Sequence, residues 1–371
     1  MKKLLAIAAT LAASSAFAGV KLEVRSDYIN TPAYDDNTGA EVASTSVFTP
    51  VVARLYLSGN VGDAQIDSGW NLRAFTPEFQ QSSAGGAGAH TTLSKTMTVD
   101  KFVDHLWIAK SMGDWTFKAG KLENNTGGFE HAKVVHGDTY LTSLAAGGVG
   151  GDTNTGTVTT PENASGVSAA YTITPEHKLE FQLLNSTNGQ TMVAGELSTD
   201  KRHNMGLAYM GSFLNKMIQA NISYIIGSGD TINIGTDATT NHEQNFMSAG
   251  LRFLPMENLT LDVDYLANSD KTAAGKAQTN STILEARYAM GMYTPVFKYE
   301  MSTDKDKNGD DNFKRDAWAL ALEVAPKADE SFRYHVAYAS VKDKDFAAAN
   351  TSDVTQNVIT VGIKYAGDIA K

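Results

Sequence analysis

The chain has 371 residues, 32 of them glycine, with no cysteine and a formal net charge of −10. The absence of cysteine excludes a disulfide framework, thiolate metal sites and a cysteine nucleophile. The acidic balance argues against a nucleic-acid-binding protein. Hydrophobic residues make up 42% of the chain, which is too many for a disordered protein. At this length either one large β-barrel or two to three average domains would fit.

The first 18 residues have the pattern of a secretory signal peptide. Lys2 and Lys3 are basic, residues 4–13 are apolar, and residues 16–18 (Ala-Phe-Ala) form a small-residue cleavage site. The apolar run is shorter than the ~20 residues that span a bilayer. The alternative is a buried N-terminal helix. We expect residues 1–18 to be removed on export and residues 19–371 to form one domain.

The rest of the chain reads as β-strands nearly throughout. Residues 259–265, Leu-Thr-Leu-Asp-Val-Asp-Tyr, show the strict alternation of apolar and polar side chains that indicates a strand with two unlike faces. Most such segments have about ten residues, the length of a tilted strand that crosses the apolar layer of a membrane. In chain order the sixteen predicted strands are 20–28, 46–58, 64–75, 101–111, 115–121, 164–174, 177–185, 203–211, 216–226, 244–253, 259–267, 281–290, 293–301, 315–325, 331–341 and 356–365.

The connections between these strands alternate between short turns and long polar segments. The long ones are 29–45, 76–100, 122–163, 186–202, 227–243, 268–280, 302–314 and 342–355. This asymmetry is typical of outer-membrane barrels, which have tight periplasmic turns and long external loops. A soluble β-sandwich, the rival interpretation, gives no reason for such regular alternation. The fold class predicted is all-β, a 16-stranded antiparallel transmembrane β-barrel.

Aromatic residues on the apolar faces gather at two levels, as expected for girdles at the two membrane interfaces. The predicted periplasmic girdle contains Tyr171, Tyr209, Phe253, Tyr288, Phe332 and Tyr365, and the external girdle contains Tyr224, Tyr265, Tyr299, Trp318 and Tyr338. The opposite faces are rich in charged residues, which implies water inside. Sixteen strands enclose too wide a lumen for side chains to fill, so the interior is expected to be a channel.

Four segments resemble, in order, parts of the sixteen-stranded general diffusion porins of Gram-negative outer membranes. They are residues 20–25, residues 52–59, residues 115–121 and residues 162–171. The resemblance covers almost the whole mature chain. It implies passive diffusion of small hydrophilic solutes and ions, a homotrimer, and an outer membrane of lipid and lipopolysaccharide as surroundings. It also implies no enzymatic activity, no cofactor, no bound metal and no nucleic-acid partner.

In that family the third external loop folds into the lumen and narrows it. The matching loop here is 122–163. The resemblance implies a basic wall of Arg25, Arg54, Lys118 and Lys121 facing an acidic loop with Glu123, Glu130 and Asp138. Alternation from Phe117 and Ala119 points Lys121 outward. A β-bulge at Gly120 would be needed to turn Lys121 inward, and without one Lys118 is the better candidate.

Two other classes of function are weighed against a general porin. A substrate-selective channel for sugars or anions would need a line of aromatic residues or a basic cluster along the lumen. An outer-membrane enzyme or adhesin would need a catalytic set at one barrel end or larger structured loops. The sequence displays neither arrangement clearly. The last predicted strand reaches Tyr365, and we expect 366–371 to form a short tail after it.

Overall fold

The computed structural model describes most of the barrel wall and the first part of the third loop. The described residues are 17–35, 41–72, 103–146, 163–185, 196–198, 203–233, 238–306, 308–326, 331–345 and 353–370. The predicted signal peptide therefore lies outside the described residues, apart from Phe17 and Ala18 at the start of the first strand. No helix among the described residues is long and apolar enough to cross a bilayer.

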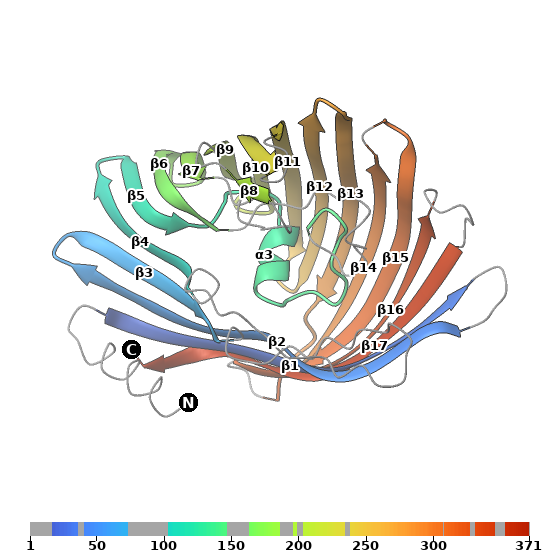
Figure 1. Cartoon of the computed structure of the whole chain (residues 1–371). Coiled ribbons are helices and arrows are strands. Elements are labelled where there is room, and N and C mark those ends of the chain that lie inside the picture. The colour runs from blue at the N-terminus through green and yellow to red at the C-terminus, as the bar shows by residue number, and fades with distance from the viewer. Residues whose placement is uncertain are drawn as a thin grey trace.

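The strands form one antiparallel sheet that closes on itself, because the first strand pairs with both the second and the last (Figure 1). The strands are β1 (Phe17–Asp35), β2 (Glu41–Val61), β3 (Ala64–Asn71), β4 (Val103–Met112), β5 (Trp115–Leu122), β6 (Ala164–Thr174), β7 (His177–Asn185), β8 (Glu196–Ser198), β9 (His203–Phe213), β10 (Ile218–Asn233), β11 (Ala238–Met256), β12 (Leu259–Thr272), β13 (Gly275–Tyr288), β14 (Tyr293–Lys305), β15 (Asp311–Val324), β16 (Phe332–Asp345) and β17 (Asp353–Ala370).

The short strand β8 does not add a position to the wall. Both β8 and β9 pair with β10, β8 at residues 231–233 and β9 at residues 218–228. These two pieces therefore occupy one wall position, and the predicted closed barrel of sixteen strands is confirmed.

The two faces of the wall have the inverse of the polarity found in a water-soluble protein. On β12, Val263 and Tyr265 point outward and are 38% and 40% exposed, whereas the inward Asp262 and Asp264 are 3% and 1% exposed. The same alternation places Phe297 and Leu320 on the outer surface of β14 and β15. An exposed apolar belt around a whole molecule is not stable in water, but it fits the hydrocarbon layer of a membrane.

Several strands extend well beyond their predicted ends. β10 and β11 leave only residues 234–237 between them, and β12 and β13 leave only residues 273–274. The predicted loops 227–243, 268–280 and 302–314 are therefore largely strand, which corrects those boundaries. These extensions are polar on both faces, so a search for apolar alternation does not detect them. The last strand also continues past Tyr365 to Ala370 and pairs with β1, with Lys21 opposite Asp368, so the expected tail is mostly strand.

The described part of the third loop lies inside the curve of the sheet. After β5 the chain turns inward and forms a single short helix, α3 (Glu130–Val135), surrounded by the wall (Figure 1). Gly128, just before the helix, has φ +70°, and a Cβ atom there would lie 2.8 Å from the Asp264 carboxylate. This approach requires glycine at that position. The inward fold of the loop, as far as it is described, agrees with the prediction.

Candidate pore constriction

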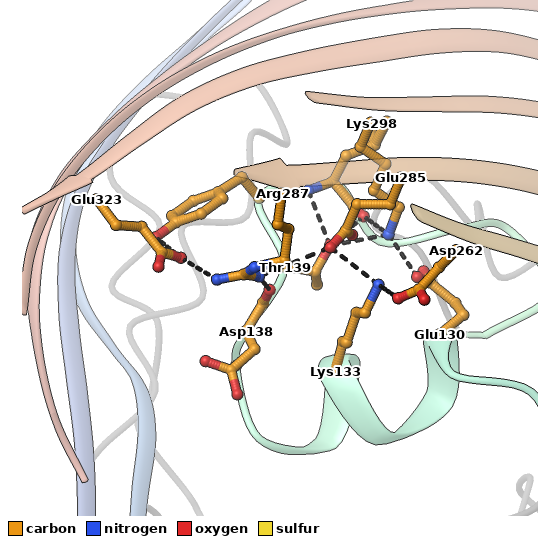
Figure 2. Close-up of polar contacts among 12 residues, drawn as sticks. Glu130, Lys133, Asp138, Thr139, Asp262, Glu285, Arg287, Lys298 and Glu323 are labelled. Carbon is orange, nitrogen blue, oxygen red and sulfur yellow. Dashed lines mark hydrogen bonds and ion pairs between the residues drawn. The ribbon is translucent and has the colours of Figure 1, made fainter. Parts of the chain in front are cut away.

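A buried lysine attaches α3 to the barrel wall. The Lys133 ammonium lies 2.6 Å from Asp262 on β12 and 2.9 Å from Glu285 on β13 (Figure 2). Its side chain is only 9% exposed. Burial alone would lower the pKa of Lys133, but the charges of Glu285 and Asp262 outweigh it and hold that pKa above its usual range. Lys133 was not among the predicted site residues.

The first residue of α3 is held by a second buried ion pair. Glu130 lies 2.5 Å from the Lys298 ammonium on β14, and the two side chains are 1% and 2% exposed. The same ammonium donates to the Thr139 hydroxyl at 2.9 Å and to the Leu141 carbonyl at 2.6 Å (Figure 2). Glu130 was predicted to lie on the acidic loop opposite basic residues of the wall; in the structure its carboxylate is buried between the loop and the wall, against Lys298.

Asp138 follows α3 and contacts cations from two neighbouring strands. Its carboxylate lies 2.7 Å from Arg333 on β16 and 2.7 Å from Lys364 on β17. The side chain is 31% exposed, so part of it reaches solvent. Burial raises the pKa of Asp138, but the charges of Lys364 and Arg333 outweigh that effect and lower it to about 2. Asp138 is therefore charged at neutral pH.

The two predicted wall arginines bind backbone carbonyl groups of the loop. Arg25 donates to the carbonyls of Gly137 at 2.7 Å and Thr139 at 2.8 Å, and it pairs with Asp27 at 2.6 Å. Arg54 pairs with Asp104 at 2.5 Å and also donates to the carbonyl of Val135. Both guanidinium groups thus face the loop, but they hold its main chain.

The structure places Lys118 and Lys121 on opposite faces of β5. Pairing between β4 and β5 is continuous across Gly120, with Trp107 opposite Gly120 and Leu106 opposite Lys121, so there is no register shift at that point. Lys118 points into the lumen, where its ammonium lies 4.8 Å from the centroid of the Trp107 ring. Lys121 shares the face of the outward Leu106 and donates to the Val103 carbonyl at 2.7 Å.

A polar cavity of about 390 Å³ lies between the loop and the wall strands β3, β4, β5, β7, β9 and β10. Titratable side chains of both signs line it: Asp67, His105, Lys118, Glu123, His131, Lys178 and Glu180. Asp67 contacts His105 at 3.0 Å, and Lys178 contacts Glu180 at 3.0 Å. Of the predicted residues, only Lys118 and the exposed Glu123 lie here.

Sequence alternation alone places Asp67, Lys178 and Glu180 on inward faces, but it does not single them out. These three residues line one cavity only because the third loop docks opposite them. Within the described part of the chain, no cluster of three or more His, Asp or Glu side chains has the geometry of a metal site.

A closed sixteen-stranded barrel with an apolar exterior, a charged interior and a loop docked inside has the fold of Gram-negative outer-membrane porins. Three solved structures of this class illustrate the similarity. OmpT of Vibrio cholerae matches with a TM-score of 0.58 and 11% identity, covering 96% of this chain and 99% of that one. The outer-membrane channel DcaP of Acinetobacter baumannii matches with a TM-score of 0.58 and 12% identity, covering 94% and 97%.

The anion-selective porin of Comamonas acidovorans matches with a TM-score of 0.57 and 15% identity, covering 94% of this chain and 100% of that one. No protein-family model and no curated protein sequence matches the chain. The similarity therefore lies in the fold.

Proposed function

We propose that the chain is an outer-membrane porin, a water-filled channel that admits small hydrophilic solutes and ions by passive diffusion. The observation that carries this proposal is the polarity of the wall, in which charged side chains face inward and an exposed apolar belt faces outward. A wall of this kind separates lipid from water only if the lumen is hydrated. No enzymatic step is required of any residue.

The solute path is proposed to follow the polar cavity between the loop and strands β3, β4, β5, β7, β9 and β10. Lys118 and Lys178 supply two positive charges there, and Asp67, Glu123 and Glu180 supply three negative ones, so the lining has a formal charge of 2 − 3 = −1 with histidines neutral. Charges of both signs orient dipolar solutes and water. An apolar solute is excluded because its entry would remove water from the charged side chains of the lining, and a large solute is excluded because it does not fit. A weak preference for cations follows.

The remaining predicted site residues are proposed to hold the loop in place. Arg25 and Arg54 bind its backbone, and Glu130 and Asp138 pair with wall cations. The constriction would then be set indirectly by these four residues and directly by those lining the cavity. Lys121, on the other face of β5, has no part in the proposed path.

Export and assembly complete the proposal. Residues 1–18 have a signal-peptide pattern and would be removed after Ala18. One solved structure of the Vibrio cholerae OmpT is described as a trimer form. A homotrimer embedded in lipid and lipopolysaccharide is proposed for this chain by analogy with that protein.

Conductance across a planar bilayer tests the proposal directly. Purified protein should insert in discrete conductance steps, and the current through each channel should rise linearly with voltage. Replacing both Lys118 and Lys178 by Glu changes the formal charge of the lining by −4 and should raise the cation-to-anion permeability ratio several-fold, measured as a reversal potential in a salt gradient.

Lys110→Glu is the matched control, because Lys110 is exposed and pairs with Asp63 at a short turn outside the cavity. Heat-modifiable, folded protein that gives no conductance would overturn the channel. A double variant with the reversal potential of the wild type would overturn the path.

A further inference from the structure

Two histidines line the polar cavity, and they come from opposite sides of it. His105 belongs to the wall strand β4, and Asp67 on the neighbouring strand β3 lines the cavity beside it. His131 belongs to α3 on the docked loop. A solute on the proposed path therefore passes an imidazole of the wall and an imidazole of the loop. The proposed function so far assigns no role to either side chain.

The wall histidine lies beside a carboxylate. The Nε2 atom of His105 is 3.0 Å from Asp67, and the two side chains are 16% and 24% exposed, so both reach the water of the cavity. On the other side, the Tyr56 ring on β2 lies 6.0 Å from the His105 ring, and its hydroxyl donates to Glu23 at 3.0 Å. A proton gained by His105 is therefore accommodated by an ion pair with Asp67.

The loop histidine is presented by a helix that is fixed to the wall. Glu130 and Lys133, on either side of His131 in the sequence, both pair with charged residues of β12–β14. His131 itself lines the cavity. The charged groups that line the cavity with it are Asp67, Lys118, Glu123, Lys178 and Glu180. The position of His131 in the path therefore follows from the docking of α3.

The formal charge of the cavity lining depends on these two imidazoles. Histidine is the side chain whose charge ordinarily changes between about pH 5 and pH 8. With both histidines neutral the lining carries −1, and with both protonated it carries −1 + 2 = +1. Charged side chains around a water-filled path determine which sign of ion is concentrated there. Two protons are therefore enough to reverse the sign of the lining.

We propose that His105 and His131 set the ion preference of the path, which favours cations at neutral and alkaline pH and anions at mildly acidic pH. The inference rests on the proposed channel and deepens it, because it concerns which ions the same path admits. At mildly acidic pH, small carboxylate and phosphate anions pass more readily than amines of equal size.

Two other interior histidines in the described part of the chain lie outside this cavity. The Nδ1 atom of His136 is 3.1 Å from Glu23, and the Nε2 atom of His335 is 2.9 Å from Asp27. Both carboxylates belong to β1, where the loop is docked. A change of selectivity caused by these two histidines would survive replacement of the two cavity histidines, so variants separate the two sources.

The test measures the reversal potential of bilayer-inserted protein in a potassium chloride gradient over a series of pH values. The cation-to-anion permeability ratio of the wild type should fall from above one to below one between about pH 7 and pH 5. With His105→Gln and His131→Gln combined, the ratio should stay above one until about pH 4, where carboxylates titrate. With both histidines replaced by Lys, the ratio should lie below one already at about pH 8 and show no step near neutrality.

His203→Gln is the matched control. His203 is exposed, and its neighbour Asn204 is 2% exposed and points inward, so alternation places His203 on the outer face of β9. This variant should show the step of the wild type. A wild-type ratio that stays constant between about pH 7 and pH 5 contradicts the inference. A wild-type step in the double Gln variant, or a ratio above one in the double Lys variant, contradicts it equally. Folded protein with no conductance at any pH counts against the channel itself, so the two failures are distinguishable.

Discussion

Replacement of Lys133 by Met should loosen the third loop from the barrel wall. The change removes the ammonium that lies between Asp262 and Glu285 and leaves both carboxylates buried. Asp262 keeps Arg252, whose guanidinium donates to it at 2.7 and 2.9 Å. The nearest remaining cation to Glu285 is Arg287 at 3.6 Å, so Glu285 bears most of the loss.

The magnitude follows from these contacts. Breaking a buried ion pair by removing one partner costs about 3–5 kcal/mol. Because Asp262 retains a bidentate partner, we expect the lower end, ~3 kcal/mol, which shifts the docking equilibrium of the loop by roughly a hundredfold. A second replacement, Glu285→Met, should recover part of the loss, because no uncompensated charge then remains at that position.

Single-channel recording and limited proteolysis measure this effect. The wild type should give one steady conductance step, whereas Lys133→Met should fluctuate between levels and be cleaved faster within the third loop. Lys110→Met, which removes an exposed lysine at a short turn, should behave like the wild type. If Lys133→Met gives the same steady conductance step as the wild type and is cleaved at the same rate, the view that this ion pair holds the loop is refuted.

Three further predictions concern the same loop. Since the pKa of Asp138 is about 2 and its ordinary value is 3.8, its stabilisation of the docked loop is complete above about pH 4 and lost as pH falls towards 2. Conductance noise should rise only in that window, and Asp138→Asn should show it already at pH 7; a rise complete above pH 4 would contradict the assignment. Gly137→Ala should lower the heat-modification midpoint more than Gly62→Ala. Both glycines have φ near +60°, but a Cβ atom at Gly137 would lie 2.5 Å from Val52, whereas at Gly62 nothing lies within 4 Å. Arg25→Ala should destabilise the loop with little change in reversal potential, since Arg25 binds the carbonyls of Gly137 and Thr139; a large selectivity change would place Arg25 in the solute path instead.

The barrel itself could be predicted from sequence because lipid imposes a simple rule on it. Every residue of a membrane-spanning strand faces either hydrocarbon or water, so segments such as 259–265 carry the pattern in their own sequence. Outside the hydrocarbon layer the rule no longer applies. The hairpin of β12 and β13 continues to Thr272 and Gly275 with polar residues on both faces. Backbone pairing and scattered contacts such as Lys271 with Glu243 sustain it there, and neither leaves a periodic pattern in the sequence.

The candidate site was harder to predict because it depends on the path of the loop. The inward positions of Arg25 and Arg54 follow from alternation, but the carbonyl groups that they bind belong to residues 135–139. Any residue supplies such an acceptor, so sequence cannot identify it. Glu130 shows the converse case. Its charge was recognised, but burial against Lys298 depends on a six-residue helix that has no periodicity of its own.

One signal for Lys133 was nevertheless present in the strand register. Asp262 and Glu285 are directly opposite each other on the inner faces of β12 and β13, and such a like-charge pair requires a cation nearby. Inside the barrel the protein supplies that cation from α3 and from Arg252. At the outer rim the opposed pair of Lys271 and Lys276 also has an opposite charge beside it, since Glu243 lies 3.0 Å from Lys271. Opposed like charges in the strand register therefore mark where the wall needs an opposite charge, which the docked loop supplies at Asp262 and Glu285 and a neighbouring strand supplies at Lys271.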